Sequence, residues 1–496
     1  MRQLKNSLLF LMVLVLVGVG QTGSASGTIR QDIGFDPGRT YPAEQLGEDF
    51  ALLRTALEEG HAGLYYYSSK EEMDADFDST AAKLNRPMTE PEFNRLVTGL
   101  IARINDGHTG VRSSAAYDRY LSNLPCLFPF SLRFVRGSAY LFRNYSEDPD
   151  IELGWAVLDI NERPISEILE HMFAYMPSDG RIETSKYRRL ESTEYFGTLY
   201  SLLYGMTTSF TVTYADPGEG TCRTTTVEGL RRGALSRIFQ ERYPAATRSL
   251  PPLEVEYRGD TAVLTIRTFS DGPYRSIGQA YPTLLRKTFQ DLEAKSVENL
   301  IVDLRENGGG ADLNGRLLVS YLLDKAYMFY THLEVMRDSF SFLEHTDAPD
   351  MQTNLKKMLR RNEQGTFDLL IHSNLGEQKP MQPTFRGKVF VLISGRSFSG
   401  SGECTSILHF HKRAKFVGEE CGAGYYGNTS GFMPQLTLPY TGLRIRLALL
   451  RYHMAVSGYA PRDRGILPDY PFTRSIQDLL QEKDSELEFA LEMIRK

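Results

Sequence analysis

Cysteine is scarce in this sequence, which has four in 496 residues. So few thiols do not make a disulfide scaffold, and their spacing fits no zinc-binding pattern. Cys404 and Cys421 flank a turn of small residues, so a disulfide between them stays open. The positions of Cys126 and Cys222 give no guide to their redox state. We expect neither a metal nor a cofactor.

Long apolar runs are absent outside the amino terminus. The one such run, residues 8–19, follows a short basic segment and precedes three small residues, which is the pattern of a secretory signal peptide. The run is short for a membrane-spanning helix, although an uncleaved membrane anchor is the alternative. No cysteine near the cleavage site offers a place for a lipid anchor. We therefore expect a signal peptide at residues 1–25 and a periplasmic or extracellular mature chain that is free of the membrane.

Two common site motifs are missing as well. Residues 307–310, NGGG, do not continue as GxxxxGK[ST], which argues against nucleotide binding. The serine-rich turn at residues 395–402 has no GxSxG, which argues against an esterase of the α/β-hydrolase type. The net charge of −6 gives no bulk attraction to nucleic acid.

Two amphipathic helices are predicted in an amino-terminal region, residues 26–114. The first spans residues 46–59. The second follows a capping box of Thr89 and Glu92 and keeps apolar residues at three-and-four spacing until an Asn-Asp-Gly stop. His108 comes directly after this stop, in a loop between glycines and not on an apolar helix face. A loop histidine without a role is the alternative.

Residues 115–250 indicate a small β-rich module with one or two helices. Short apolar strands alternate with turns, including a predicted hairpin across Arg136 and Gly137. A strand, a turn and a helix are expected over residues 154–169. No catalytic constellation lies in this segment, so it is predicted to bind or to gate.

Residues 251–475 alternate strands with helices and are predicted to form an α/β core. The apolar strand at residues 299–304 is typical of a parallel sheet covered on both faces. A polar, irregular insertion is expected at about 331–384. Helices are predicted at residues 281–294, 316–323 and, beyond the core, 476–496.

The stretch from residue 388 to 412 brings a serine to the end of a buried strand. KVFVLIS predicts the strand, GRSFSGSG a tight turn, and residues 403–412 a helix whose first N–H groups point at the turn. A serine nucleophile needs such a place, because it must reach a carbonyl carbon and find donors for the oxyanion. A plain Gly/Ser turn is the alternative.

Four stretches follow one another in the second half of the chain. They are NLIVDLRENGGG (299–310), SFSGSGE (397–403), VGEECGAG (417–424) and GILPDYPF (465–472). Together they resemble the tail-specific (C-terminal processing) and tricorn-core serine peptidase family. DGHTG resembles the amino-terminal part of the tricorn-like branch, and GWAVLDINERPISEIL resembles a PDZ-like module. The resemblance implies peptide-bond hydrolysis by a serine, in a crotonase-like α/β core with an amino-terminal helical region and a small β-rich PDZ-like module.

The resemblance implies Ser399 as the nucleophile, with Ser401 as the alternative. The family serine commonly precedes a glutamate by three residues, but Gly400 holds that position here, so the turn carries one residue more. Ser399 follows a Ser-Phe pair, much as the family serine follows its own pair. The oxyanion hole is expected from Gly400 with Gly309 and Gly310, whose turn ends a strand of the core.

His108 matches the general base of the tricorn-like branch. The tail-specific branch uses a lysine, and the corresponding GEECGAGYYG contains none. A neutral imidazole can take the serine proton near pH 7. The family glutamate before the last motif is missing, and Asp463 is the acid nearest to its place. It is expected either to orient the site or to pair with Arg462 or Arg464.

The sequence therefore predicts an exported serine endopeptidase that forms an acyl-enzyme on Ser399, with His108 as the base. Its expected partner is a peptide or unfolded protein substrate, not nucleic acid. The alternative is a catalytically inactive relative that binds peptides or hydrophobic ligands in the same cleft, which the extra turn residue and the missing glutamate favour. Oligomeric state and side-chain preference are left open.

Overall fold

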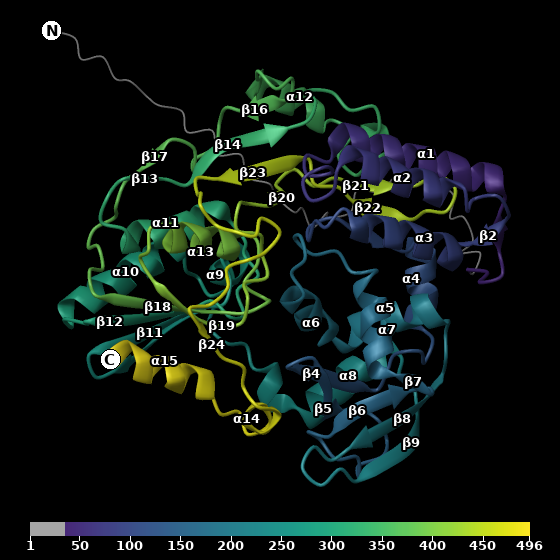
Figure 1. Cartoon of the computed structure of the whole chain (residues 1–496), viewed down its shortest axis with the longest axis horizontal. Coiled ribbons are helices and arrows are strands. Elements are labelled where there is room, and N and C mark those ends of the chain that lie inside the picture. The colour runs from purple at the N-terminus through teal and green to yellow at the C-terminus, as the bar shows by residue number, and fades with distance from the viewer. Residues whose placement is uncertain (1–34) are drawn as a thin grey trace. The chain divides into compact units, whose positions relative to one another are not determined.

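The computed structural model describes residues 35–496, so the predicted signal peptide lies outside the described part (Figure 1). Three helices open this part: α1 (Ala43–Gly60), α2 (Lys70–Ala81) and α3 (Glu90–Arg103). Thr89 and Glu92 cap α3 by exchanging hydrogen bonds, as the sequence predicts. Strands β1 (Thr40–Tyr41) and β2 (Met88–Thr89) pair beside them. Among the described residues, we find no helix with the length and apolar character that crossing a membrane requires.

A six-stranded sheet forms the centre of the α/β region. Its order is β10 (Leu253–Arg258), β11 (Thr261–Ile266), β12 (Asn299–Asp303), β18 (Lys388–Ile393), β19 (Lys415–Gly418) and β24 (Tyr470–Pro471). β10 joins β11 as an antiparallel hairpin, and all the other neighbours are parallel. The carboxyl ends of β12 and β18 therefore lie side by side. This arrangement places the NGGG turn next to the serine turn.

Helices cover both faces of this sheet, as the apolar strands predict. Leu264, Val302 and Val391 pack into the main core with one set of helices. Ile301 and Leu392 point to the other face, where they meet the carboxyl-terminal helix. The helices are α9 (Asp271–Ser276), α10 (Tyr281–Ala294), α11 (Asp312–Leu322) and α13 (Gly400–Phe410) on the first face, and α14 (Ile476–Leu480) and α15 (Ser485–Arg495) towards the chain end (Figure 1).

The segment 331–384 differs from its prediction as an irregular insertion. β14 (Tyr330–Val335) lies in the middle of a second sheet of order β15 (Leu359–Arg361), β16 (Phe367–Leu369), β14, β23 (Leu450–Met454) and β20 (Thr429–Ser430). Leu333 and Val335 are buried, so one face of β14 joins the main core. Shorter elements complete the segment: β17 (Glu377–Gln378), which pairs with β13 (Tyr327–Met328) just before the segment, α12 (Met351–Leu355) and two 3-10 turns (Leu343–His345, Lys356–Met358).

A third, small sheet joins the amino-terminal region to the end of the core. Its order is β21 (Gln435–Thr437), β22 (Arg444–Arg446) and β3 (Gly110–Arg112). β3 directly follows His108 and Thr109, and it pairs antiparallel with β22. Residues of α1 and α3 share one buried core with the central sheet. The loop that carries His108 is therefore held against the α/β region.

The module at residues 115–250 has its own buried core. Its sheet runs β4 (Phe130–Val135), β5 (Ser138–Asn144), β6 (Ala156–Ile160), β8 (Ser209–Ala215) and β9 (Cys222–Glu228), with β7 (Arg163–Pro164) beside β6. The predicted hairpin and the strand, turn and helix are present, but the segment holds five α-helices where one or two are expected. They are α4 (Ala115–Ser122), α5 (Ile165–Phe173), α6 (Thr184–Leu190), α7 (Thr193–Tyr204) and α8 (Arg232–Arg242), followed by a 3-10 turn (Pro244–Thr247).

The four cysteines are all free thiols in this structure, so Cys404 and Cys421 do not form the disulfide that their positions leave open. Both are buried, and the Cys421 thiol donates to the backbone oxygen of Ser397 at 3.0 Å.

Candidate active site

Ser399 lies on the turn between β18 and α13. It is the residue just before α13, with φ 55° and ψ −129°, a conformation that non-glycine residues rarely adopt. Its side chain makes no capping hydrogen bond to the helix, and the residue is half-buried. A strained strand-to-helix turn of this kind presents a hydroxyl to the surroundings. Ser399 thus meets the positional requirement for a nucleophile.

Ser401 lies one step inside α13 and is completely buried, with 0% of its surface exposed. Its hydroxyl has no hydrogen-bond partner in the part of the chain that the structure describes. A substrate carbonyl cannot reach a hydroxyl that is sealed inside the helix packing. The geometry therefore favours Ser399 over the alternative nucleophile.

The NGGG turn packs directly against the serine turn. The parallel pairing of β12 and β18 brings them together, and the N–H of Phe398 donates to the backbone oxygen of Asn307 at 3.2 Å. Gly309 and Gly310 both have positive φ, 94° and 140°. Such angles are costly for any residue with a Cβ. This turn therefore requires glycine for its shape.

The backbone N–H groups of Gly400 and Gly310, one from each turn, have no hydrogen-bond partner within residues 35–496. Gly309 differs from the prediction, because its N–H donates to the side-chain oxygen of Asn307 at 2.9 Å. It is therefore not a free donor for an oxyanion. Gly309 instead allows the backbone to approach the serine turn closely. The two N–H groups that we assign to the oxyanion hole are those of Gly400 and Gly310.

Replacing Gly309 by alanine is expected to lower kcat about 100-fold, because a displaced serine turn carries the Gly400 N–H out of place and the loss of one oxyanion donor has about that effect. A methyl group there would lie 2.7 Å from the Phe398 oxygen, 2.8 Å from the Ser399 Cβ and 2.9 Å from the Gly400 nitrogen. The serine turn must shift to relieve these contacts. Steady-state kinetics on a peptide substrate measure the change.

Gly308→Ala is the matched control, because no atom lies within 4 Å of a Cβ at that position. We expect its kcat and melting temperature to stay close to those of the wild type. A wild-type kcat in Gly309→Ala would show that the serine turn tolerates displacement and would contradict the assignment.

His108 reaches the serine turn from a distant part of the sequence. Its imidazole stacks on the ring of Phe398, with centroids 4.5 Å apart and planes at 29°. Gly107 allows this contact, since a Cβ there would lie 2.7 Å from the Phe398 ring. The guanidinium of Arg446, on β22, donates to the His108 backbone oxygen at 2.8 Å. The fold therefore places the predicted base beside the residue that precedes the predicted nucleophile.

A buried carboxylate that sequence reasoning missed lies beside the His108 ring. Asp106 Oδ1 is 4.0 Å from His108 Nδ1, a nitrogen that is buried and otherwise unpartnered among the described residues. Asp106 Oδ2 is 2.9 Å from the Nε2 of His61 and accepts from the Thr109 hydroxyl at 2.6 Å. Asp106 is thus positioned to orient the base.

Burial, hydrogen bonds and neighbouring charges set the protonation states of Asp106 and His108. Burial alone would raise the pKa of Asp106, but the hydrogen bond from His61 and the charges of both histidines lower it to about 2. Burial lowers the pKa of His108 to about 4, although the Asp106 carboxylate acts in the opposite direction. At neutral pH Asp106 is therefore ionised and His108 is neutral, which is the state a general base needs.

Asp179 is a second buried acid that no sequence pattern indicates. Its carboxylate accepts the N–H of Gly107 at 2.9 Å and that of Gly424 at 3.1 Å. It therefore ties the loop of His108 to the GEECGAG segment. Burial and the nearby Asp106 carboxylate raise the pKa of Asp179 to about 7.

Glu403, in the first turn of α13, holds the serine turn in place. Its carboxyl group accepts the Tyr330 hydroxyl at 2.6 Å and the Asn428 side-chain amide at 2.7 Å. These bonds tie the first turn of α13 to the second sheet. Burial, together with the negative charge of Asp312, raises the pKa of Glu403 to about 8. Glu403 is thus a neutral hydrogen-bonding group at pH 7.

Asp463 does not take the place of the missing family glutamate. Its carboxylate pairs with Arg181, and its backbone oxygen accepts the Arg181 N–H at 2.9 Å. Within the described residues we find no contact of its side chain with His108 or Ser399. The pairing also differs from the predicted partners Arg462 and Arg464, and the latter binds Glu420. Asp463 therefore fastens a surface loop, and Asp106 is the acid beside the base.

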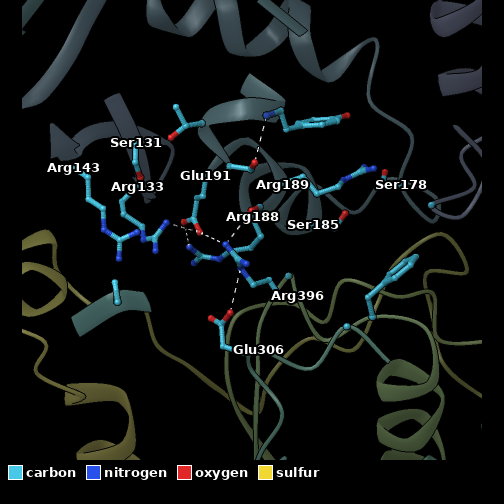
Figure 2. Close-up of a pocket in the computed structure, with 18 of the residues that line it drawn as sticks. Ser131, Arg133, Arg143, Ser178, Ser185, Arg188, Arg189, Glu191, Glu306 and Arg396 are labelled. Atoms are coloured by element: carbon cyan, nitrogen blue, oxygen red, sulfur yellow. Dashed lines mark hydrogen bonds and ion pairs between the residues drawn. The ribbon is translucent and has the colours of Figure 1, made fainter. Parts of the chain in front are cut away.

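A cleft of about 910 Å³ opens beside the two turns (Figure 2). On the catalytic side it is lined by Gly107, Gly308 and Phe398, which adjoin the predicted base, oxyanion hole and nucleophile. The module forms the opposite wall. That wall comprises residues of β4, β5, α6 and α7, among them Ser131, Arg133, Arg143, Arg188, Arg189, Glu191 and Tyr195.

Two groups of side chains in the described part could bring ligand atoms together around a cation. One is Asp106, His108 and Asp179, but the carboxylate oxygens of both acids already accept hydrogen bonds. The other is His332, Glu334 and His453, on β14 and β23. The first group therefore forms a hydrogen-bonded network around the base.

Comparisons with known proteins bear on the family and the fold of the chain. Residues 260–472 match the model of peptidase family S41, and no curated protein sequence matches the chain. Mature CPAF has a similar structure, with a TM-score of 0.60 at 17% identity, over 91% of this chain and 98% of that chain. The photosystem II D1 C-terminal processing protease gives a TM-score of 0.41 at 12% identity, over 87% of this chain and 92% of that chain. The likeness to CPAF shows a shared mixed α/β fold.

Proposed function

Because the chain belongs to peptidase family S41 and is a serine-type peptidase, we propose that it is an exported endopeptidase whose nucleophile is Ser399 and whose general base is His108. One observation carries the assignment. Ser399 is half-buried on a strained turn, its hydroxyl makes no capping hydrogen bond, and the unpartnered N–H groups of Gly400 and Gly310 lie next to it. Its substrates are peptides or unfolded proteins.

Acylation begins when the imidazole of His108 takes the proton of the Ser399 hydroxyl. The oxygen attacks the peptide carbonyl carbon, and the negative oxygen that forms accepts from the N–H groups of Gly400 and Gly310. Each such donor lowers the barrier by about 2.7–4 kcal/mol. When the tetrahedral adduct collapses, the C–N bond breaks and the departing amine takes the proton from the imidazolium. Asp106, ionised and 4.0 Å from Nδ1, stabilises that imidazolium.

Deacylation repeats these steps with water. His108 takes a proton from the water molecule, whose oxygen attacks the acyl ester and forms a second tetrahedral adduct. This adduct breaks its bond to Ser399, which regains a proton from the imidazolium. The products are the carboxylic acid of the cleaved peptide and the free enzyme.

The remaining parts of the chain fit this function. We assign the six-stranded sheet to a crotonase-like core and residues 115–250 to a PDZ-like module that gates or binds substrate, a role supported by its position along one wall of the cleft. The basic and apolar pattern of residues 1–25 supports export to the periplasm or the exterior. Neither nucleic acid nor membrane attachment is needed.

A fluorescent fluorophosphonate tests the proposal, because it labels a serine only where a base activates it. We expect the mature protein, residues 26–496, to be labelled stoichiometrically and to cleave unfolded casein. Labelling should decrease as casein is added, since both compete for one hydroxyl. A protein that binds peptides but neither reacts with the probe nor cleaves would instead be a catalytically inactive relative.

A further inference from the structure

Five arginines line the cleft: Arg133, Arg143, Arg188, Arg189 and Arg396. The lining has two carboxylates, Glu191 and Glu306, and this excess of positive charge stands out in a protein of net charge −6. We propose that the cleft binds acidic side chains of the substrate, so that this peptidase prefers peptides with several Asp or Glu residues near the cleaved bond. The inference rests on the proposed function and names its substrate class.

One buried carboxylate serves three of the arginines. Glu191 binds Arg188, and its Oε2 lies 3.2 Å from Arg133 and 3.0 Å from Arg396 (Figure 2). Glu306 is 3.6 Å from the Arg396 guanidinium, but its side chain is 65% exposed, so water screens that pair. A second carboxylate, Glu419, also binds Arg188 through two hydrogen bonds. Arg133, Arg188 and Arg396 therefore share two well-held carboxylates, and most of the surplus positive charge of the cleft comes from its other two arginines.

The arginines are close enough to raise one another's energy. Burial lowers the pKa of the Arg133 guanidinium; Glu191 opposes this, but three neighbouring guanidinium groups lower it further. A bound carboxylate would relieve this repulsion while gaining two-pronged hydrogen bonds from a planar guanidinium. The free cleft is thus arranged for an anionic ligand.

Two of the arginines have no carboxylate of their own. Across residues 35–496 no ion pair joins Arg143 or Arg189 to an acid. The Arg143 guanidinium is held between aromatic rings, 5.1 Å from the centroids of Phe142 and Phe239. Arg189 lies towards the catalytic end, since its charge is one of those that lower the pKa of His108. Both are available to a ligand.

The positions of these two arginines decide which carboxylates fit. Figure 2 shows Arg143 and Arg189 on opposite sides of Glu191. A single carboxylate, such as the end of a peptide chain, can satisfy one of them and leave the other unpaired. A segment with two or more acidic side chains can satisfy both, and a cleft of about 910 Å³ holds a segment of that kind.

Internally quenched peptides that differ only by Glu or Gln at the residues flanking the cleaved bond test the inference. We expect wild-type kcat/KM to be about 100-fold higher for the Glu peptide, because each charged hydrogen-bonded contact contributes about tenfold. The ratio should fall towards one in Arg143→Gln/Arg189→Gln and shrink at 0.5 M salt. Arg237→Gln, an exposed arginine of the same module, is the control and should keep the wild-type ratio.

Three outcomes would overturn the inference. Equal kcat/KM for the two peptides in the wild type is the first, and a ratio that survives in the double variant is the second. The third is a preference that disappears when the peptide carboxyl terminus is amidated, which would assign the arginines to a chain end.

Binding separates this inference from the peptidase proposal. Ser399→Ala should bind the labelled Glu peptide more tightly than the Gln peptide in fluorescence anisotropy, with an affinity that falls as salt is added. Such binding, without cleavage by the wild type, would contradict the peptidase proposal and support the preference for acidic peptides. Cleavage of both peptides at the same rate would support the peptidase proposal and contradict the preference for acidic peptides.

Discussion

Ser399→Ala is expected to lower kcat for peptide hydrolysis by about four orders of magnitude or more, and to abolish labelling by a fluorophosphonate. The reason is that the acyl-enzyme cannot form without the hydroxyl oxygen. Folding should be unaffected, since the side chain makes no capping hydrogen bond to α13. Active-site labelling, casein cleavage and a melting curve measure the three quantities.

Ser401→Ala is the matched control for this variant. Its hydroxyl is buried and unpartnered, so its removal exchanges an unsatisfied polar group for a methyl and costs little stability. We expect kcat within a few-fold of the wild type. The reverse pattern, with an active Ser399→Ala and an inactive Ser401→Ala, would move the nucleophile by two residues and require the turn to open.

The pH profile is expected to have an acid limb near pH 4. His108 acts as a base only when it is neutral, and burial lowers its pKa to about 4. Below that pH the imidazole is protonated, so kcat/KM should fall about tenfold per pH unit, while from pH 5 to 7 it should be flat with respect to this group. Initial rates at low substrate concentration, with activity recovered on return to pH 7, measure the limb.

Two variants test whether His108 is the group that titrates. His108→Ala should lower kcat/KM by about 10²–10⁴-fold, the usual contribution of a general base, and the limb near pH 4 should vanish. Arg189→Gln should move the limb to higher pH, because the positive charge of Arg189 helps to lower the pKa of His108. A limb near pH 6.5, the ordinary pKa of histidine, would show that the base is exposed to solvent and would contradict its burial.

The sequence predicted well those elements whose signals are local. The capping box of Thr89 and Glu92 begins α3, and the structure shows both hydrogen bonds. The apolar strand at residues 299–303 is central in a parallel sheet, as its lack of polar alternation indicates. The turn that carries Ser399 joins β18 to α13, although the helix begins three residues earlier than predicted.

The prediction failed where an element depends on distant partners. β14 looks like part of a polar insertion because Thr331 and His332 are adjacent polar residues that interrupt the alternation of a strand. Its place becomes clear only from its pairing with β23, more than a hundred residues away. Helix α7 carries tyrosine and phenylalanine at positions that also suit a strand. It is helical because this face packs into the core of the module.

The same division applies to the site. By itself the sequence determined that a serine stands at a strand-to-helix turn, that glycines follow the neighbouring strand, and that a histidine follows the stop signal of α3. These features depend on residue types and short-range geometry. Only the tertiary structure decided that Ser399 and not Ser401 is accessible, that Gly309 is already hydrogen-bonded, and that the His108 loop packs on Phe398.

Tertiary structure also decided the charges around the site. Asp106, Asp179 and Glu403 are ordinary acids in the sequence, and their pKa values move because the fold buries them against particular partners. The arginine-lined cleft likewise joins α6 and two strands of the module to turns of the α/β core. Burial, charge and hydrogen bonding are properties of groups that meet in space, so a linear pattern of residues does not contain them until the chain has folded.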